Sequence, residues 1–412
     1  MQLLRRRLAA QGLASPSPIE PIKRRDAGEP APLSAAQRRM WFLQQLQPHS
    51  VANNICVGIR LRGGLDVAAF RAALRDTLGR HDVLRTVYRA GPGGNPEQVV
   101  LDGYTLAVPL RDCADVPERQ QESLIDELAC EIGSRAFELS AEPPVELTLL
   151  RMSDQEHVLL LVAHHIAWDD SSWGLLLNEV ALRYRSGANA SLPSIPVQYG
   201  DFAAWEQART FDRDALDYWR KRLLPAPEPL ALPVDFPRTA TLSESGGRRT
   251  RALPADLADR VRVEAQRAGV TPFMLLLAAF TAVLHRYSGT HDIAIGSPVV
   301  NRDRPEVAGL VGNFGNMVVL RTDLGGEPTF SGLLERVRAT CTEAYAHQAM
   351  PFDTLVAPAA APNTGPLGVL RRDVLAAFAD SARLRAAWGR GERAARVQRC
   401  RPVRPVAGRG AR

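Results

Sequence analysis

One segment of the apolar pattern, residues 157–177, predicts the centre of the fold. Its five consecutive aliphatic residues, 158–162, are typical of a strand that is buried on both faces. Two histidines and two acids follow, namely His164, His165, Asp169 and Asp170. Apolar residues then recur at helical spacing, which predicts a helix with an acid or serine of this segment at its N-cap. Titratable side chains are therefore expected at the end of a buried strand, where α/β proteins tend to carry their chemistry.

Periodicity also predicts helices and strands on both sides of this segment. Alternation indicates a strand over residues 55–63, and helical spacing indicates a helix over residues 66–78, with Gly79 placed to end it. Further helices are expected over residues 118–137, 212–224, 255–268 and 330–347, a buried helix is expected to begin at Thr271-Pro272, and strands are expected over residues 292–300 and 318–324. This order predicts an α/β fold of the α+β kind, with mixed sheets covered by helices.

The length of 412 residues predicts two lobes. Residues 1–33 are interpreted as a helix and a proline-rich linker, residues 34–190 as a first lobe, and residues 191–357 as a second lobe. The pattern ends after Val356, and residues 358–412 are interpreted as an Ala- and Arg-rich tail that is expected to be disordered.

Charge and cysteine content exclude several classes of function. The formal net charge is +6, but residues 371–412 hold twelve arginines and three acids, so the preceding part of the chain carries −3. A nucleic-acid-binding role is therefore not expected. The five cysteines form no CxxC pair, so neither a metal site nor a disulfide framework is expected from them. With no secretory signal and no apolar run that spans a bilayer, the chain is expected to be cytoplasmic and not bound to membranes.

Six segments in order carry a family resemblance. They are SAAQRRMWFL (34–43), RHDVLRTVY (80–88), HHIAWDD (164–170), YGDFAAW (199–205), VGNFGNMVVLR (311–321) and HQAMPFD (347–353). Together they resemble the core motifs of the condensation domains of nonribosomal peptide synthetases, and they extend over residues 34–353.

The resemblance implies two chloramphenicol acetyltransferase-like lobes, arranged as a V-shaped pseudo-dimer with a tunnel between them. It implies amide formation: the amine of an aminoacyl group on an acceptor peptidyl carrier protein attacks the thioester on a donor peptidyl carrier protein. The phosphopantetheine arms belong to these carrier proteins, so no cofactor is expected on this chain. Adenylation domains are expected to act in trans, because this sequence contains none.

The resemblance also implies roles for individual residues. His165 matches the second histidine of the family motif and is expected to take the proton of the amine or to position the amine. Successive strand residues face opposite sides, so His164 and His165 cannot both face the tunnel. The resemblance implies that His164 is the structural one. Asp169 is expected to form an ion pair that orders its loop, with Arg85 or Arg302 as the partner. Asn316, in the fifth segment, is expected to line the tunnel.

The sequence departs from the family pattern at Asp170, where the family has glycine. Its side chain is interpreted as favouring an ammonium-bearing acceptor or as capping the following helix, and the cap is preferred. The segment DDSSW also resembles epimerization domains, although the second half lacks the matching motifs. A non-catalytic platform or a truncated condensation-like fragment is a further alternative. The sequence after residue 357 is interpreted either as a reading-frame change or incomplete gene, or as a divergent tail.

Overall fold

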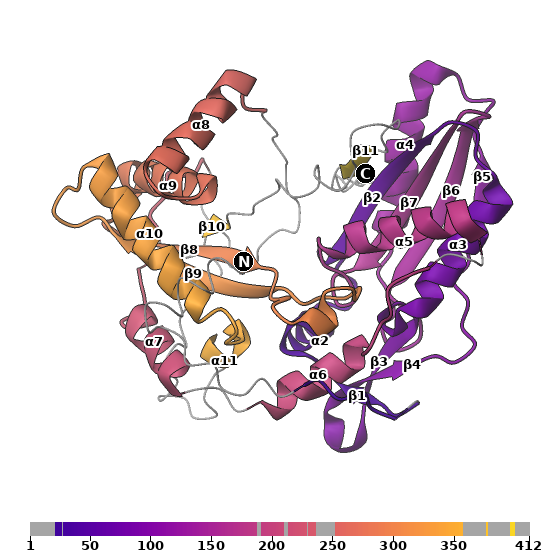
Figure 1. Cartoon of the computed structure of the whole chain (residues 1–412), viewed down its shortest axis with the longest axis horizontal. Coiled ribbons are helices and arrows are strands. Elements are labelled where there is room, and N and C mark those ends of the chain that lie inside the picture. Colours follow the sequence, from indigo (N-terminus) through magenta and orange to yellow (C-terminus); the bar gives the residue numbers. More distant parts are fainter. Residues whose placement is uncertain are drawn as a thin grey trace, which may run out of the picture.

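The computed structural model describes residues 21–26, 28–187, 191–209, 213–228, 230–235, 252–356, 376–377 and 396–399. Figure 1 shows two groups of elements, each with its own sheet and helices, that diverge at the top of the view and approach each other at the bottom, near α2 and α6. This arrangement is consistent with the V expected from the resemblance, and the mixed α/β fold class is confirmed.

The first lobe is built on a five-stranded sheet with the order β11-β2-β7-β6-β5. Its strands are β2 (Asn54–Arg62), β5 (Leu110–Asp112), β6 (Val145–Ser153), β7 (Glu156–His164) and β11 (Arg396–Arg399). Neighbouring strands are antiparallel except for β5 and β6, which are parallel. The central strand β7 is therefore paired on both edges, so its backbone N–H and C=O groups have partners in both neighbouring strands.

Helices cover both faces of this sheet, and the alternation of side chains along β7 follows from that. Leu159 and Leu161 pack in a core cluster with residues of α3 (Val67–Arg80) and α5 (Ser172–Ser186). Val158 and Leu160 pack on the other face with residues of α4 (Glu118–Gly133). The prediction of a strand buried on both faces is confirmed.

A small sheet and two helices lie where the lobes approach each other. The sheet has the order β1-β4-β3, with β1 (Ala31–Pro32), β3 (Thr86–Ala90) and β4 (Pro96–Val100). Helix α2 (Ala35–Leu46) begins at a capping box formed by Ser34 and Gln37, and α6 (Tyr199–Ala208) packs beside β1 and α2. Short 3-10 helices are formed by Asp82–Arg85, Pro92–Gly94 and Pro305–Val307.

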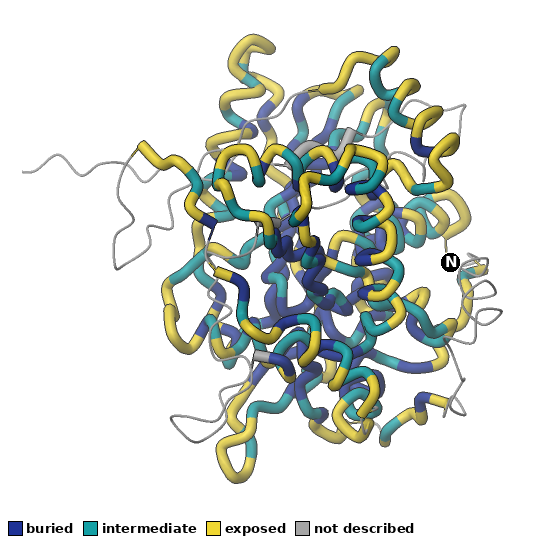
Figure 2. Tube along the Cα trace, turned by 90° about the vertical axis from the view of Figure 1, so that its left-hand side faces the viewer, coloured by how far each residue is buried: buried dark blue, intermediate teal, exposed yellow. Residues whose placement is uncertain are grey.

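The second lobe has a sheet with the order β10-β8-β9. Strands β8 (Asp292–Val299) and β9 (Asn316–Asp323) are antiparallel, and β10 (Ala376–Ala377) runs parallel to β8. Its helices are α7 (Arg213–Leu223), α8 (Ala255–Arg267), α9 (Pro272–Ser288), α10 (Phe330–Ala346) and α11 (Phe352–Val356). Thr271 caps α9 and Pro272 occupies its first turn, as the sequence predicts. Figure 2 shows the buried positions, in dark blue, gathered inside the molecule.

Some predicted boundaries were wrong. Gly79 does not end α3, which continues to Arg80 and has His81 at its C-cap. The backbone of Gly79 has no positive φ, so the glycine is accommodated as an ordinary helical residue. Helix α4 ends at Gly133, earlier than the predicted 137, because Phe137 leaves the helix and packs in the core of the first lobe.

The bounds of the two lobes, residues 34–190 and 191–357, stay a prediction. Of residues 358–412 the structure describes only β10 and β11. In the described part of the chain, no single helix has the length and apolar character to cross a bilayer, whereas α8 and α9, bent by 102° at their junction, meet that test of length and composition together.

Candidate functional site

The two histidines lie at the C-terminal end of β7, one inside the strand and one just beyond it. His164 is the last residue of β7 and pairs with Asn54 of β2. The backbone N–H of His165 donates to the carbonyl of Asn53 at 2.8 Å, which extends the β2 pairing by one step. Residues 165–171 then form the loop to α5, and we call this segment the histidine loop. The strand pairing thus fixes where the loop begins.

The ring of His165 is oriented by a backbone carbonyl of its own loop. Its Nδ1 lies 2.6 Å from the carbonyl oxygen of Trp168. A carbonyl can only accept a hydrogen bond, so Nδ1 carries the proton and the neutral ring has its lone pair on Nε2. The side chain is half-buried. His165 therefore offers a fixed hydrogen-bond acceptor at Nε2.

His164 has a different environment. Its side chain is 1% exposed, and Nδ1 accepts the N–H of Ile166 at 3.1 Å. The ring of Phe137 packs edge-on against it, with centroids 6.5 Å apart. Burial, with a smaller contribution from His165, lowers the pKa of His164 to about 3. The side chain is thus neutral at physiological pH and is enclosed by the protein.

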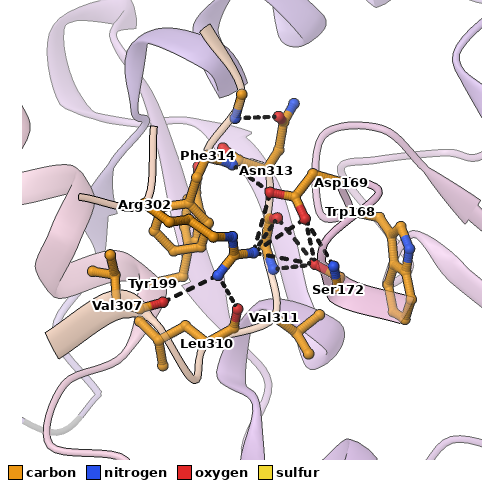
Figure 3. A network of polar contacts seen from close by, with 12 residues as sticks. Trp168, Asp169, Ser172, Tyr199, Arg302, Val307, Leu310, Val311, Asn313 and Phe314 are labelled. Carbon is orange, nitrogen blue, oxygen red and sulfur yellow. Dashed lines mark hydrogen bonds and ion pairs between the residues drawn. The ribbon is translucent and has the colours of Figure 1, made fainter. Parts of the chain in front are cut away.

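Asp169 accepts hydrogen bonds from both lobes, as Figure 3 shows. On the side of α5, its Oδ1 accepts the backbone N–H and the hydroxyl of Ser172, each at 2.9 Å. On the side of the second lobe, its Oδ2 accepts the backbone N–H of Phe314 at 3.2 Å. The guanidinium of Arg302 lies 3.1 Å from both carboxylate oxygens. The acceptor capacity of this buried carboxylate is therefore used for holding the histidine loop.

Arg302 is held as firmly as its partner. Its Nη1 donates to the backbone carbonyls of Val307 and Leu310, and its guanidinium stacks over the ring of Phe314 at 4.1 Å. Of the two arginines considered from the sequence, the structure therefore joins Arg302 to Asp169. Arg85 lies elsewhere and pairs with Asp82 at 2.6 Å and with Asp102 at 3.7 Å.

The segment 312–314 contacts residues of both α5 and α6. Ser172 Oγ accepts the N–H of Gly312 at 3.1 Å, and the hydroxyl of Tyr199 hydrogen-bonds to Ser34 Oγ at 2.8 Å and donates to the carbonyl of Asn313. Gly312 has a φ of 156°, and a Cβ there would lie 2.2 Å from the ring of Tyr199. Only glycine allows this approach of the second lobe to the histidine loop.

The remaining predicted residues have separate positions. Asp170 is exposed. At the start of α5, Ser171 occupies the N-cap position, and the carboxylate of Asp169 accepts the N–H of Ser172. Asn316 is 9% exposed, and its amide donates to the carbonyls of Gln348 and Met350 at 2.9 and 2.6 Å. It also accepts the N–H of Phe352 at 3.0 Å, so it holds the segment that leads into α11.

A small, partly open cavity lies between α2, α6 and the second lobe. The sequence SAA at the start of α2 lines it together with Phe202, Glu206, Asn313, Asn316 and Asp353, among others. Burial raises the pKa of the carboxyl groups of Glu206 and Asp353. Neither His164 nor His165 lines this cavity, so it is separate from the histidine loop.

In the described part of the chain, the histidine loop contributes to no group of three potential metal ligands. Nδ1 of each histidine is already used, and the carboxylate of Asp169 is saturated with donors. Among the described residues, one group has three potential metal ligands in reach of one another: His285, His291 and Glu327 of the second lobe.

Sequence reasoning missed three contributors to the site. The carbonyl of Trp168, the hydroxyl of Ser172 and the hydroxyl of Tyr199 all position the loop or its support. Tyr199 lies inside a segment that carries the family resemblance and Ser172 lies two residues after the end of another, which was the available signal. The carbonyl of Trp168 has no side-chain signature, since any residue supplies one.

The comparisons with known proteins show which family the chain resembles. The model of the family described as "Condensation domain" matches residues 28–367. The phosphinothricin tripeptide synthetase PhsC of Streptomyces viridochromogenes is 40% identical over 360 residues, which are 86% of this chain and 33% of that protein. One of the linear gramicidin synthase proteins of Brevibacillus parabrevis is 42% identical over 334 residues, which are 79% of this chain and 6% of that protein.

Among solved structures, the X-domain from teicoplanin biosynthesis matches with a TM-score of 0.72 and 28% identity, over 86% of this chain and 77% of that one. The chain thus spans a third or less of the length of the two curated relatives, and it corresponds to one domain-sized part of them. These relatives give the epimerization alternative no specific support. The chain belongs to the condensation domain family, the amide-forming transferase domains of nonribosomal peptide synthetases.

Proposed function

We propose that this chain joins two carrier-bound substrates through an amide bond, with Nε2 of His165 as the acceptor for the proton of the attacking amine. The amine nitrogen bonds to the thioester carbonyl carbon of the donor, the carbon–sulfur bond breaks, and the donor arm leaves as a thiol. The proton lost by the nitrogen passes to Nε2 and from there to the leaving sulfur. The product remains on the acceptor arm.

The observation that supports this role is the 2.6 Å contact between Nδ1 of His165 and the carbonyl of Trp168. It fixes the tautomer that has a lone pair on Nε2, which is the form that an incoming amine needs. Nε2 also orients the amine before the reaction, so the same hydrogen bond positions the amine and then receives its proton. His164 cannot substitute, because its ring is enclosed and its Nδ1 already accepts the N–H of Ile166.

In this proposal Asp169 and Arg302 act through the histidine loop and do not touch the substrates. The rest of the acceleration comes from holding both thioesters together, which contributes on the order of 7–11 kcal/mol in favourable cases. The partners are a donor and an acceptor carrier protein, each with a phosphopantetheine arm, and adenylation domains load them. A covalent intermediate on the chain is not required.

The experiment is intact mass spectrometry of two carrier proteins, one loaded as donor and one as acceptor, after incubation with the chain. The acceptor is expected to gain the mass of the donor acyl group. His165→Ala should slow this transfer by about 10²–10⁴-fold, the usual contribution of a positioned acid–base group. His49→Ala, at an exposed position, is the matched control and should leave the rate unchanged.

The outcomes separate the alternatives. Transfer that is insensitive to His165→Ala would contradict the role of His165. A chain that does not transfer but inverts the chirality of a loaded aminoacyl group would be an epimerase. A chain that binds loaded carriers without any change in mass or chirality would be the non-catalytic platform.

A further inference from the structure

Three potential metal ligands meet at one corner of the second lobe, remote in sequence from the histidine loop. His285 belongs to the last turn of α9, His291 directly precedes β8, and Glu327 follows the turn after β9. One ligand atom of each lies within 4.8 Å of the ligand atoms of the other two. The N–H of Leu324 donates to the carbonyl of His291 at 2.7 Å, so the backbone fixes the turn against the start of β8.

His285 is oriented as metal-binding histidines are. Its Nδ1 lies 2.9 Å from the carbonyl oxygen of Thr290, so Nδ1 carries the proton and Nε2 has the lone pair. Metal-bound histidines commonly donate their other ring N–H to a backbone carbonyl, which fixes the tautomer and the ring plane. The ring of His291 lies beside it, with centroids 4.8 Å apart and planes at 42°. Both imidazoles therefore occupy the same small region.

Glu327 reaches this region from an unusual backbone conformation. Its φ is 49°, in the left-handed region that disfavours residues with a side chain, and it directly follows Gly326 with a φ of 78°. A non-glycine residue in this region has a conformational cost, and such residues often occur at functional sites. Here the left-handed residue is Glu327, whose carboxylate lies next to the imidazoles of His285 and His291.

From this arrangement we propose that His285, His291 and Glu327 bind a zinc ion, with the fourth position open to solvent. Two imidazoles and one carboxylate are a common ligand set for Zn²⁺. Ligand atoms at about 2.1 Å from a tetrahedral zinc ion lie about 3.4 Å apart. The distances between the ligand atoms of the three side chains therefore have to shorten by about 1.4 Å at most. His291 and Glu327 are exposed and His285 half-buried, so rotation of the two exposed side chains supplies this closure.

A neighbouring acid does not compete for this role. Asp292 follows His291 directly, but Arg321 contacts both of its carboxylate oxygens, with Nε at 2.9 and 3.0 Å. The metal would join three elements: α9, the start of β8 and the turn after β9. Its effect would be to stabilise the second lobe, because an ion that binds the folded state alone raises its stability.

The test uses the full chain, purified without a polyhistidine tag and freed of metal with a chelator. Zn²⁺ is titrated in competition with a chromophoric chelator, and Co²⁺ is added separately because its visible absorption reports the coordination. We expect one equivalent of Zn²⁺ to bind, a four-coordinate Co²⁺ spectrum, and a higher melting temperature with Zn²⁺. His291→Ala and Glu327→Gln should each weaken Zn²⁺ binding at least tenfold and remove the thermal shift.

The control is His49→Ala, which removes an exposed histidine elsewhere and should leave the affinity, the spectrum and the thermal shift unchanged. Melting of the metal-free variants identifies any that fail to fold. The proposal is overturned if no equivalent of Zn²⁺ binds. It is also overturned if folded His291→Ala and Glu327→Gln variants bind Zn²⁺ as the unmodified chain does, since the ion would then occupy other side chains.

Discussion

The carboxylate of Asp169 and the guanidinium of Arg302 lie 3.1 Å apart although 133 residues separate them in the sequence. Asp169 belongs to the histidine loop of the first lobe, and Arg302 to the segment that follows β8 in the second (Figure 3). The side chains are 9% and 8% exposed, so the pair is shielded from water. The loop that carries His165 is therefore anchored at its far end by the other lobe.

Asp169→Ala is expected to lower the free energy of unfolding by about 3–5 kcal/mol, because it leaves the guanidinium of Arg302 buried without its counter-charge. The double variant Asp169→Ala/Arg302→Met should lose less than the sum of the two single variants, since the unpaired charge is then absent. Urea unfolding of the unmodified chain, of Asp169→Ala, of Arg302→Met and of the double variant measures this coupling. Additive losses would contradict the pairing.

The buried neutral state of His164 predicts a pH dependence of stability. Its pKa is about 3 in the folded chain against an ordinary value of 6.5, so the unfolded chain takes up the proton first as the pH falls. The stability that this group contributes is complete above pH 6.5 and is lost progressively toward pH 3. Between those limits the slope is about 1.4 kcal/mol per pH unit.

His164→Asn retains an acceptor for the N–H of Ile166 but does not titrate, so it isolates this effect. Chemical denaturation at several values between pH 7.5 and pH 5 should show the unmodified chain losing stability relative to the variant, by roughly the slope given by linkage. His49→Asn should reproduce the curve of the unmodified chain. Parallel curves for the chain and His164→Asn would show that His164 is not a buried neutral group.

Gly312→Ala is expected to be severely destabilising. The new Cβ would lie 2.2 and 2.5 Å from two carbons of the Tyr199 ring, which is 1% exposed and cannot move away. Overpacking of this kind costs about 1–3 kcal/mol, and the φ of 156° adds backbone strain. Gly309→Ala is the matched control, because no atom lies within 4 Å of its Cβ position. Equal melting temperatures for the two variants would contradict the packing described here.

Asn316→Asp tests whether this residue supports the segment before α11. Asparagine donates two hydrogen bonds to the carbonyls of Gln348 and Met350, and aspartate would place a negative charge against the same oxygens. We expect a loss of about 1–3 kcal/mol, the usual cost of leaving buried polar groups unsatisfied. The same substitution at exposed Asn95 is the control. A loss no larger than in that control would argue against this role.

Much of the fold could be predicted from the sequence because its signals are local. The aliphatic run of β7 and the Thr271-Pro272 start of α9 each depend on residues a few positions apart. The partner of Asp169 could not be chosen, because only the tertiary arrangement separates Arg85 from Arg302. Likewise, the hydrogen bonds of Asn316 to the backbone of residues 348–352 could not be foreseen from the sequence, and its place at a tunnel stays a prediction.

The group of His285, His291 and Glu327 had no local signal. The spacing between its second and third members spans all of β8 and β9, so no short motif contains them. The hairpin brings them together, and the left-handed conformation of Glu327 is visible only in the structure. Sites assembled from the ends of several elements are therefore found by geometry and not by motif.

The hydrogen bond from His165 to the carbonyl of Trp168 connects the ring of His165 to the contact between the two lobes. Trp168 directly precedes Asp169, and Asp169 is anchored to Arg302 and to the N–H of Phe314. The residue whose carbonyl orients the ring of His165 and the residue that binds the other lobe are therefore adjacent in the backbone. The direction of the Nε2 lone pair in this structure thus depends on a loop whose far end is held by the other lobe.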